Sequence, residues 1–195
     1  MDAAAFFVLR HEPLHGLFTD RLFADLTDAH LRARPHGQNS IAWLLWHVAR
    51  GEDIGVNRFA YDQPQVLDEG DWEKRTGAGR RDLGTAMTTD EVTAFTARVD
   101  VTALRDYWTA VGRRTRSMLQ QRGTEGWDNV VDPALIRRTI RESGDYGPKV
   151  VAERTEAFYA GMTRGWAFGH LALTHSFAHF GEATVVRSLL GFTGA

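Results

Sequence analysis

The chain has 195 residues and a formal net charge of -2, with 43% apolar residues and no cysteine. This length suits one domain, and the lack of cysteine excludes disulfides, thiolate metal sites and a cysteine nucleophile. Without a basic cluster we expect no nucleic-acid partner. No apolar run approaches the ~20 residues of a membrane helix, and the N-terminus does not resemble a signal peptide, so we expect a cytoplasmic protein that does not associate with membranes.

The first half of the chain predicts two long helices. Apolar residues recur at helical spacing over residues 3–26, although Pro13 lies inside this segment and predicts a kink or a break. A second helix is expected over residues 40–61, and its first half is apolar on nearly all sides, which indicates burial between neighbouring helices. Residues 62–87 contain glycine, proline and many charges, so we predict a loop there.

The second half of the chain predicts two further long helices. Thr88 and Glu91 form a capping-box pattern that indicates the start of a short helix. A long amphipathic helix is expected from Asp100, because apolar residues step by three and four positions over about five turns. Residues 123–150 show no periodicity, and loops of this length are usually functional or partly structured. The last helix is expected over residues 163–190.

Four long amphipathic helices without a strand pattern predict an all-α protein, a four-helix bundle that forms a single domain over residues 1–195. The connections between the helices are too long for a minimal up-down bundle. We therefore expect at least one crossover connection between distant ends of the bundle.

Three histidines are candidates for a metal site. His47 follows four apolar residues in WLLWHV, so burial of its ring requires partners for both nitrogens, either a cation or a backbone carbonyl or carboxylate. His175 and His179 are four residues apart, so their Cβ atoms lie about 6 Å apart on one helix face. Such a pair can bind a borderline cation such as zinc or nickel, or can be buried with one ring bonded to Glu182.

The three histidines together are more informative than His47 alone or the pair of His175 and His179 alone, since a bundle can hold ligands from two facing helices. A site with three histidine ligands leaves positions open for water or substrate, which is typical of catalytic metal sites. Carboxylates are expected to hold the free ring N–H groups, and the candidates are Glu52, Asp53 and Glu182.

The remaining histidines are weaker candidates. His11 and His15 are four residues apart, but Pro13 lies between them, so we expect them not to be ligands, although His11 could line a pocket. His170 precedes His175 by five residues and is expected to point elsewhere on an α-helix.

Three segments resemble the DinB-like superfamily: SIAWLLWHVARGED, MTTDEVTAFTARVDVTALRDYWTAVGRRT and HLALTHSFAHFGEATVVRSLLG. The resemblance implies an up-down-down-up four-helix bundle with a metal site formed by His47, His175 and His179. It also implies that the metal is usually nickel or zinc, sometimes iron or manganese, and that the protein is a homodimer. Characterised members include mycothiol-dependent maleylpyruvate isomerase and bacillithiol S-transferases, in which the metal activates a low-molecular-weight thiol.

Several functions are compatible with these observations. The leading hypothesis is a metal-dependent transferase or isomerase that uses a low-molecular-weight thiol such as mycothiol on a small-molecule substrate. An alternative is a metal-dependent hydrolase with Glu182 or Glu52 as the base. Two further alternatives are a stress-response protein that binds a metal or ligand without catalysis, and a bundle whose three histidines are only buried and hydrogen-bonded.

Overall fold

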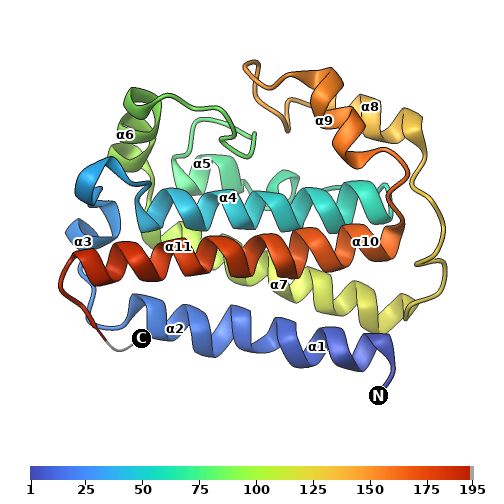
Figure 1. The fold of residues 1–195 in the computed structure, drawn as a ribbon, viewed down its shortest axis with the longest axis horizontal. Coiled ribbons are helices and arrows are strands. Elements are labelled where there is room, and N and C mark those ends of the chain that lie inside the picture. The colour runs from blue at the N-terminus through green and yellow to red at the C-terminus, as the bar shows by residue number, and fades with distance from the viewer. Residues whose placement is uncertain (194–195) are drawn as a thin grey trace.

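Four long helical segments lie side by side in the computed structural model, which describes residues 1–193 (Figure 1). They are built from α1 (Ala3–Pro13), η1 (Leu14–Phe18) and α2 (Thr19–Phe23); α4 (Ile41–Asp53) and η3 (Ile54–Ala60); α7 (Val101–Arg122); and α10 (Arg164–Gly169), η5 (His170–Thr174) and α11 (His175–Leu189). The first and last segments run in one direction and the middle two run in the other. This is the up-down-down-up arrangement that the resemblance to the DinB-like superfamily implies.

Shorter helices occupy the connections between the four segments: α3 (Asp28–Arg32), η2 (Pro35–Gly37), η4 (Val66–Asp68), α5 (Trp72–Thr76), α6 (Thr89–Arg98), α8 (Pro133–Arg141) and α9 (Ala152–Tyr159). Since α4 and α7 are parallel, the chain between them returns along the bundle, and this is the expected crossover (Figure 1). The segment 62–87, predicted as a loop, also contains two short helices, η4 and α5. Residues 1–193 form no β-strand, and an isolated antiparallel bridge pairs Val130 with Thr163.

The helices begin where the sequence supplies capping side chains. Ser40 accepts a hydrogen bond from the backbone N–H of Trp43 at the start of α4. Thr88 and Glu91 form the predicted capping box at the start of α6. Asp100 caps α7 through the N–H of Ala103. Each cap satisfies a backbone donor that has no partner inside its helix.

Three of the long segments contain a π-helical stretch, namely η1, η3 and η5. A π-helical stretch adds a residue to the turn and brings positions five apart onto one face. Pro13 ends α1, and η1 follows it directly, so the predicted break does not occur. Because proline has no N–H to close the α-helical bond, the chain changes its hydrogen-bond pattern there and remains helical.

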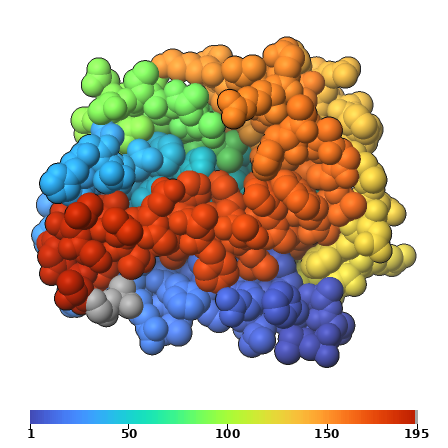
Figure 2. Space-filling view, viewed as in Figure 1, coloured from blue at the N-terminus to red at the C-terminus, as the bar shows by residue number. Residues whose placement is uncertain are grey.

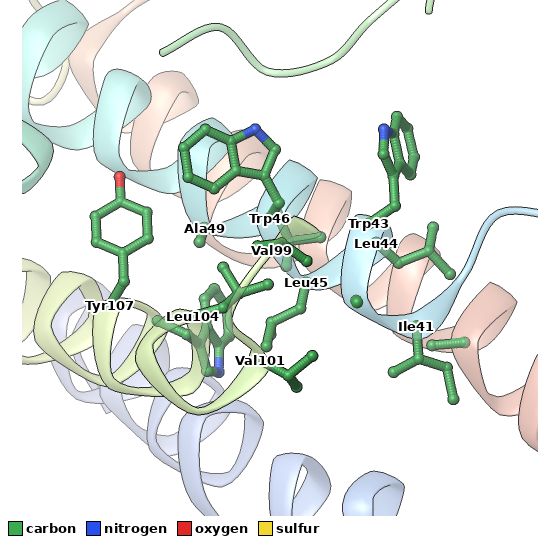
Figure 3. Close-up of a cluster of buried hydrophobic side chains, with 14 of the residues drawn as sticks. Ile41, Trp43, Leu44, Leu45, Trp46, Ala49, Val99, Val101, Leu104 and Tyr107 are labelled. Carbon is green, nitrogen blue, oxygen red and sulfur yellow. The ribbon is translucent and has the colours of Figure 1, made fainter. Parts of the chain in front are cut away.

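All residues of α4 are buried, as its apolar sequence predicts. It lies between α7 and α11, and its residues Leu45, Trp46 and Ala49 face Leu104 and Tyr107 of α7 (Figure 3). Burial of one such side chain stabilises the fold by roughly 1.5–3 kcal/mol. The most buried helix of the bundle is therefore also the helix that carries His47. In the described part of the chain, no helix combines the length and apolar character that spanning a bilayer requires.

Candidate metal centre

His47, His175 and His179 come together in the structure. His47 lies in α4, while His175 and His179 lie in the first turn and a half of α11. One ring nitrogen from each residue lies within 4.8 Å of the others. The Nε2 atoms of His47 and His175 are 3.0 Å apart, and the ring of His179 is 4.6 Å from each of the other two rings, measured between centroids.

The orientation of His47 is set by the backbone. Its Nδ1 lies 2.8 Å from the carbonyl oxygen of Leu83, which can only accept, so Nδ1 carries the proton and Nε2 presents a lone pair to His175. The ring also stacks on Trp43, with centroids 4.9 Å apart. Burial, and then the neighbouring His179, lower the pKa of His47 to about 4, so the ring is neutral near pH 7.

A carboxylate sets the orientation of His179. Its Nδ1 lies 3.1 Å from Oε2 of Glu182, one turn further along α11. Donation of the Nδ1 proton to Glu182 leaves Nε2 as the free acceptor, the pattern common for histidines that bind metals. Of the three carboxylates that the sequence offers, Glu182 is the one that contacts this cluster.

His175 is held mainly by packing. Its Nδ1 is buried and has no hydrogen-bond partner within residues 1–193. Gly51 of α4 lies directly beneath the ring, and a Cβ atom there would come within 2.9 Å of Cε1 of His175. Burial, and then His47, lower the pKa of His175 to about 2. The centre thus brings together three imidazole rings, a donor set that suits borderline divalent cations such as zinc and nickel.

His170 does not point away from the cluster, so that expectation is wrong. It lies at the start of η5, and the π-helical turn places it on the same face as His175, with ring centroids 6.5 Å apart. The imidazole stacks on Trp166 at 4.3 Å and has no hydrogen-bond partner in the part of the chain that the structure describes. Desolvation lowers the pKa of His170. A neutral imidazole therefore faces the cavity beside the centre.

The cavity beside the centre has a volume of about 460 Å³ and is lined by His47, His170 and His175. One of its walls is the segment around Leu83, and the opposite wall is α9 with the residues before it. Figure 2 shows the corresponding recess between the green and orange segments, with α4 in teal behind it. A molecule in this cavity can reach the rings of His47 and His175.

Glu52 lies in a second cluster, so it does not support the three histidines. Its carboxylate accepts hydrogen bonds from Nε2 of His11 at 2.8 Å, Nε2 of His15 at 2.9 Å and Oγ1 of Thr115 at 2.6 Å. Burial alone would raise the pKa of Glu52, but His15 and His11 outweigh it and hold the pKa well below its ordinary value. His11 is therefore completely buried and does not line the cavity.

This second cluster also brings three ligand-type atoms within 4.8 Å of one another, but its hydrogen bonds differ from those of a metal site. Nη1 of Arg116 lies 3.2 Å from Nδ1 of His11. Because a guanidinium only donates, Nδ1 of His11 accepts, and the ring proton lies on Nε2, where it faces Glu52. The cluster is thus a charged hydrogen-bond network that ties α1 to α4.

Asp53 also lies away from the three histidines and anchors connecting segments. Its carboxylate accepts hydrogen bonds from Arg50, Asn57, Tyr107 and the backbone N–H groups of Val66 and Leu67. Arg50 is fully buried and also donates to the carbonyl of Arg81 and the side chains of Gln65 and Asp145. Since Arg81 is two residues before Leu83, this network holds the segment whose carbonyl orients His47.

Comparison with known proteins assigns the family. The sequence profile of the DinB superfamily matches residues 19–183, so the chain belongs to the DinB superfamily. The fold is also similar to the crystal structure of a conserved protein from Enterococcus faecalis, with a TM-score of 0.72, 21% identity, and coverage of 98% of this chain and 99% of that chain. No functionally curated protein matches the sequence.

Proposed function

We propose that this protein is a metal-dependent enzyme in which His47, His175 and His179 hold one divalent cation, nickel or zinc. The observation that carries the proposal is the approach of Nε2 of His47 and Nε2 of His175 to 3.0 Å at the edge of a cavity of about 460 Å³. Three protein ligands leave coordination positions for an exogenous group, and the cavity gives that group access.

The reaction we propose is transfer or isomerisation that uses a low-molecular-weight thiol, such as mycothiol, with a small-molecule electrophile. When bound, a divalent cation favours the thiolate form of a thiol, which is the nucleophilic form. Leu83 and Glu182 keep the two flanking imidazoles in the tautomer that presents Nε2. His170, with a neutral ring facing the cavity, can accept the thiol proton. Such thiols are kept reduced in the cytoplasm, so we place the reaction there.

The positions of the carboxylates favour a thiol over water as the nucleophile. Glu52, one of two bases considered for a hydrolase, is fully buried between His11 and His15. The other, Glu182, is bonded to the Nδ1 side of His179 and orients that ring. No aspartate or glutamate lines the cavity among the described residues.

We also propose a homodimer that buries one apolar face. Several large apolar side chains on α1, η1 and α11 are about half exposed, and they are Phe6, Leu9, Leu17, Val185 and Leu189. Exposed apolar surface of this kind marks interaction sites. Sedimentation of the parent and of a Leu9→Asp, Val185→Asp variant tests the proposal, and a parent that sediments as a monomer contradicts it.

The experiment that tests the enzymatic proposal combines metal analysis with thiol transfer. Protein purified without a tag is analysed for metals, loaded with nickel or zinc, and assayed with several low-molecular-weight thiols and a chromogenic electrophile. We expect about one equivalent of metal and turnover that chelation abolishes. If the metal had only a structural role, its removal by a chelator would instead unfold much of the protein. Loaded protein that transfers no thiol to any electrophile contradicts the proposed reaction.

A further inference from the structure

The cavity beside His47 and His175 has an uneven distribution of charge. Its walls are mostly apolar and include Val150, Val151, Phe158 and Leu171. Its charged lining residues are Lys149 and Arg154, and no carboxylate balances them within the described lining. The whole chain carries a net charge of -2, so this local excess of positive charge is not a general property of the surface.

The two cations differ in their surroundings. Nζ of Lys149 lies 2.7 Å from Oε2 of Glu91, so much of its charge is offset. Arg154 lies in α9 and forms no ion pair or hydrogen bond within residues 1–193. A guanidinium presents its N–H donors in a planar fork that matches a carboxylate. Arg154 is therefore the cation available to a ligand.

The apolar residues near Arg154 suggest what the rest of the ligand is. Val151 and Phe158 line the cavity but are more than half exposed, at 61% and 59%. Phe158 packs edge to face against Trp166, with centroids 5.8 Å apart, and so extends an aromatic wall toward His170. A ligand with an apolar body would cover these side chains and remove that surface from water.

We propose that the substrate of this cavity is a small amphipathic carboxylate. Its acidic group pairs with Arg154, its apolar part lies against Val151 and Phe158, and its reacting end faces His47 and His175. A single unpaired guanidinium among apolar walls suits a monoanionic carboxylate, whereas a phosphate dianion would require more positive charge. The identification of this ligand as a substrate rests on the proposed function, but its binding does not.

The binding test uses hexanoate and its neutral analogue hexanamide as probes, titrated calorimetrically into the purified protein. We expect hexanoate to bind about tenfold more tightly than hexanamide, the order expected for one charge-assisted hydrogen bond. Arg154→Gln should remove this preference. Arg137→Gln is the matched control, because Arg137 is an exposed arginine that lines a different cavity, and it should leave the preference intact.

Two results would overturn the inference: equal binding of the two probes to the parent, or a preference for hexanoate that persists in Arg154→Gln. A second titration separates this inference from the proposed function. In cobalt-loaded protein, 6-mercaptohexanoate and 6-mercaptohexanamide should both change the visible spectrum of the metal. If neither thiol does so while the Arg154-dependent preference for hexanoate remains, thiol activation is wrong and the carboxylate site stands.

Discussion

The Nε2 atoms of His47 and His175 lie 3.0 Å apart, although the residues are 128 positions apart in the chain. The carbonyl of Leu83 keeps the proton of His47 on Nδ1, so Nε2 of His47 directs a lone pair into the space between the two rings. Either a shared proton or a cation can occupy that space. The choice between them determines what the protein does, and it can be measured directly.

The first prediction concerns metal content. His47→Ala, His175→Ala and His179→Ala should each lose the one equivalent of metal expected in the parent, as measured by elemental analysis. His11→Ala should retain it, because the second cluster holds a proton at Nε2 of His11. Retention of metal in His175→Ala contradicts the proposed centre. If the parent instead contains a second equivalent of metal that His11→Ala loses, the cluster around Glu52 also binds a cation.

The second prediction concerns the space between α4 and α11. Gly51→Ala should weaken metal binding by at least tenfold and lower stability by about 1–3 kcal/mol, since the added methyl group would displace the ring of His175. Gly169→Ala is the matched control, because a Cβ atom there meets nothing within 4 Å, and alanine in a helix should be neutral or stabilising by up to about 1 kcal/mol. Metal titration and denaturant unfolding measure both effects, and equal behaviour of the two variants contradicts this packing argument.

The third prediction concerns the support of His179. Glu182→Gln should retain the fold but bind the metal about tenfold more weakly, because the carboxylate that accepts the Nδ1 proton is lost. Glu125→Gln, which changes an exposed carboxylate elsewhere, should not alter affinity. Competition with a chelator of known affinity provides the measurement. An unchanged affinity in Glu182→Gln would mean that His179 is held by other contacts.

The fourth prediction concerns pH and the buried network around Glu52. Because the folded protein holds the pKa of Glu52 below its ordinary value of 4.5, the folded state binds fewer protons than the unfolded chain as the pH approaches 4.5 from above. The contribution of Glu52 to stability is therefore fully present above pH 4.5 and is lost as the pH falls below it. Glu52→Gln should cost about 3 kcal/mol at pH 7, and the difference from the parent should shrink in acid.

Denaturant unfolding at pH 7 and pH 4 tests this expectation. Glu12→Gln is the control, since Glu12 is exposed on the same helix as His11. A cost below about 1 kcal/mol for Glu52→Gln at pH 7 would be typical of a surface pair and would contradict the network described above.

Periodicity predicted the four long helices, and a capping box predicted the start of one short helix. Thr88 and Glu91 were sufficient to place α6, because a capping box is a local interaction. The helix α8 was not predicted within residues 123–150, since it is only nine residues long and its neighbours have no regular pattern. Short helices depend on packing for their stability and leave a weak pattern in the sequence.

The candidate site was predicted in part for similar reasons. His175 and His179 follow ordinary helical spacing, and His47 stands out in its apolar surroundings. The position of His170 could not be predicted, because the π-helical turn of η5 changes which residues share a face. The different roles of Glu52 and Asp53 depend on which neighbouring helix each faces, and composition carries no information about those contacts.

Arg50 has a consequence for any attempt to redesign the cavity. One guanidinium contacts three connecting segments through Gln65, Arg81 and Asp145. A replacement loop that does not place an acceptor at the same point would leave this buried charge without its full set of acceptors. The three loops therefore form one exchangeable unit, and grafts that move them together should be tolerated better than grafts of any one.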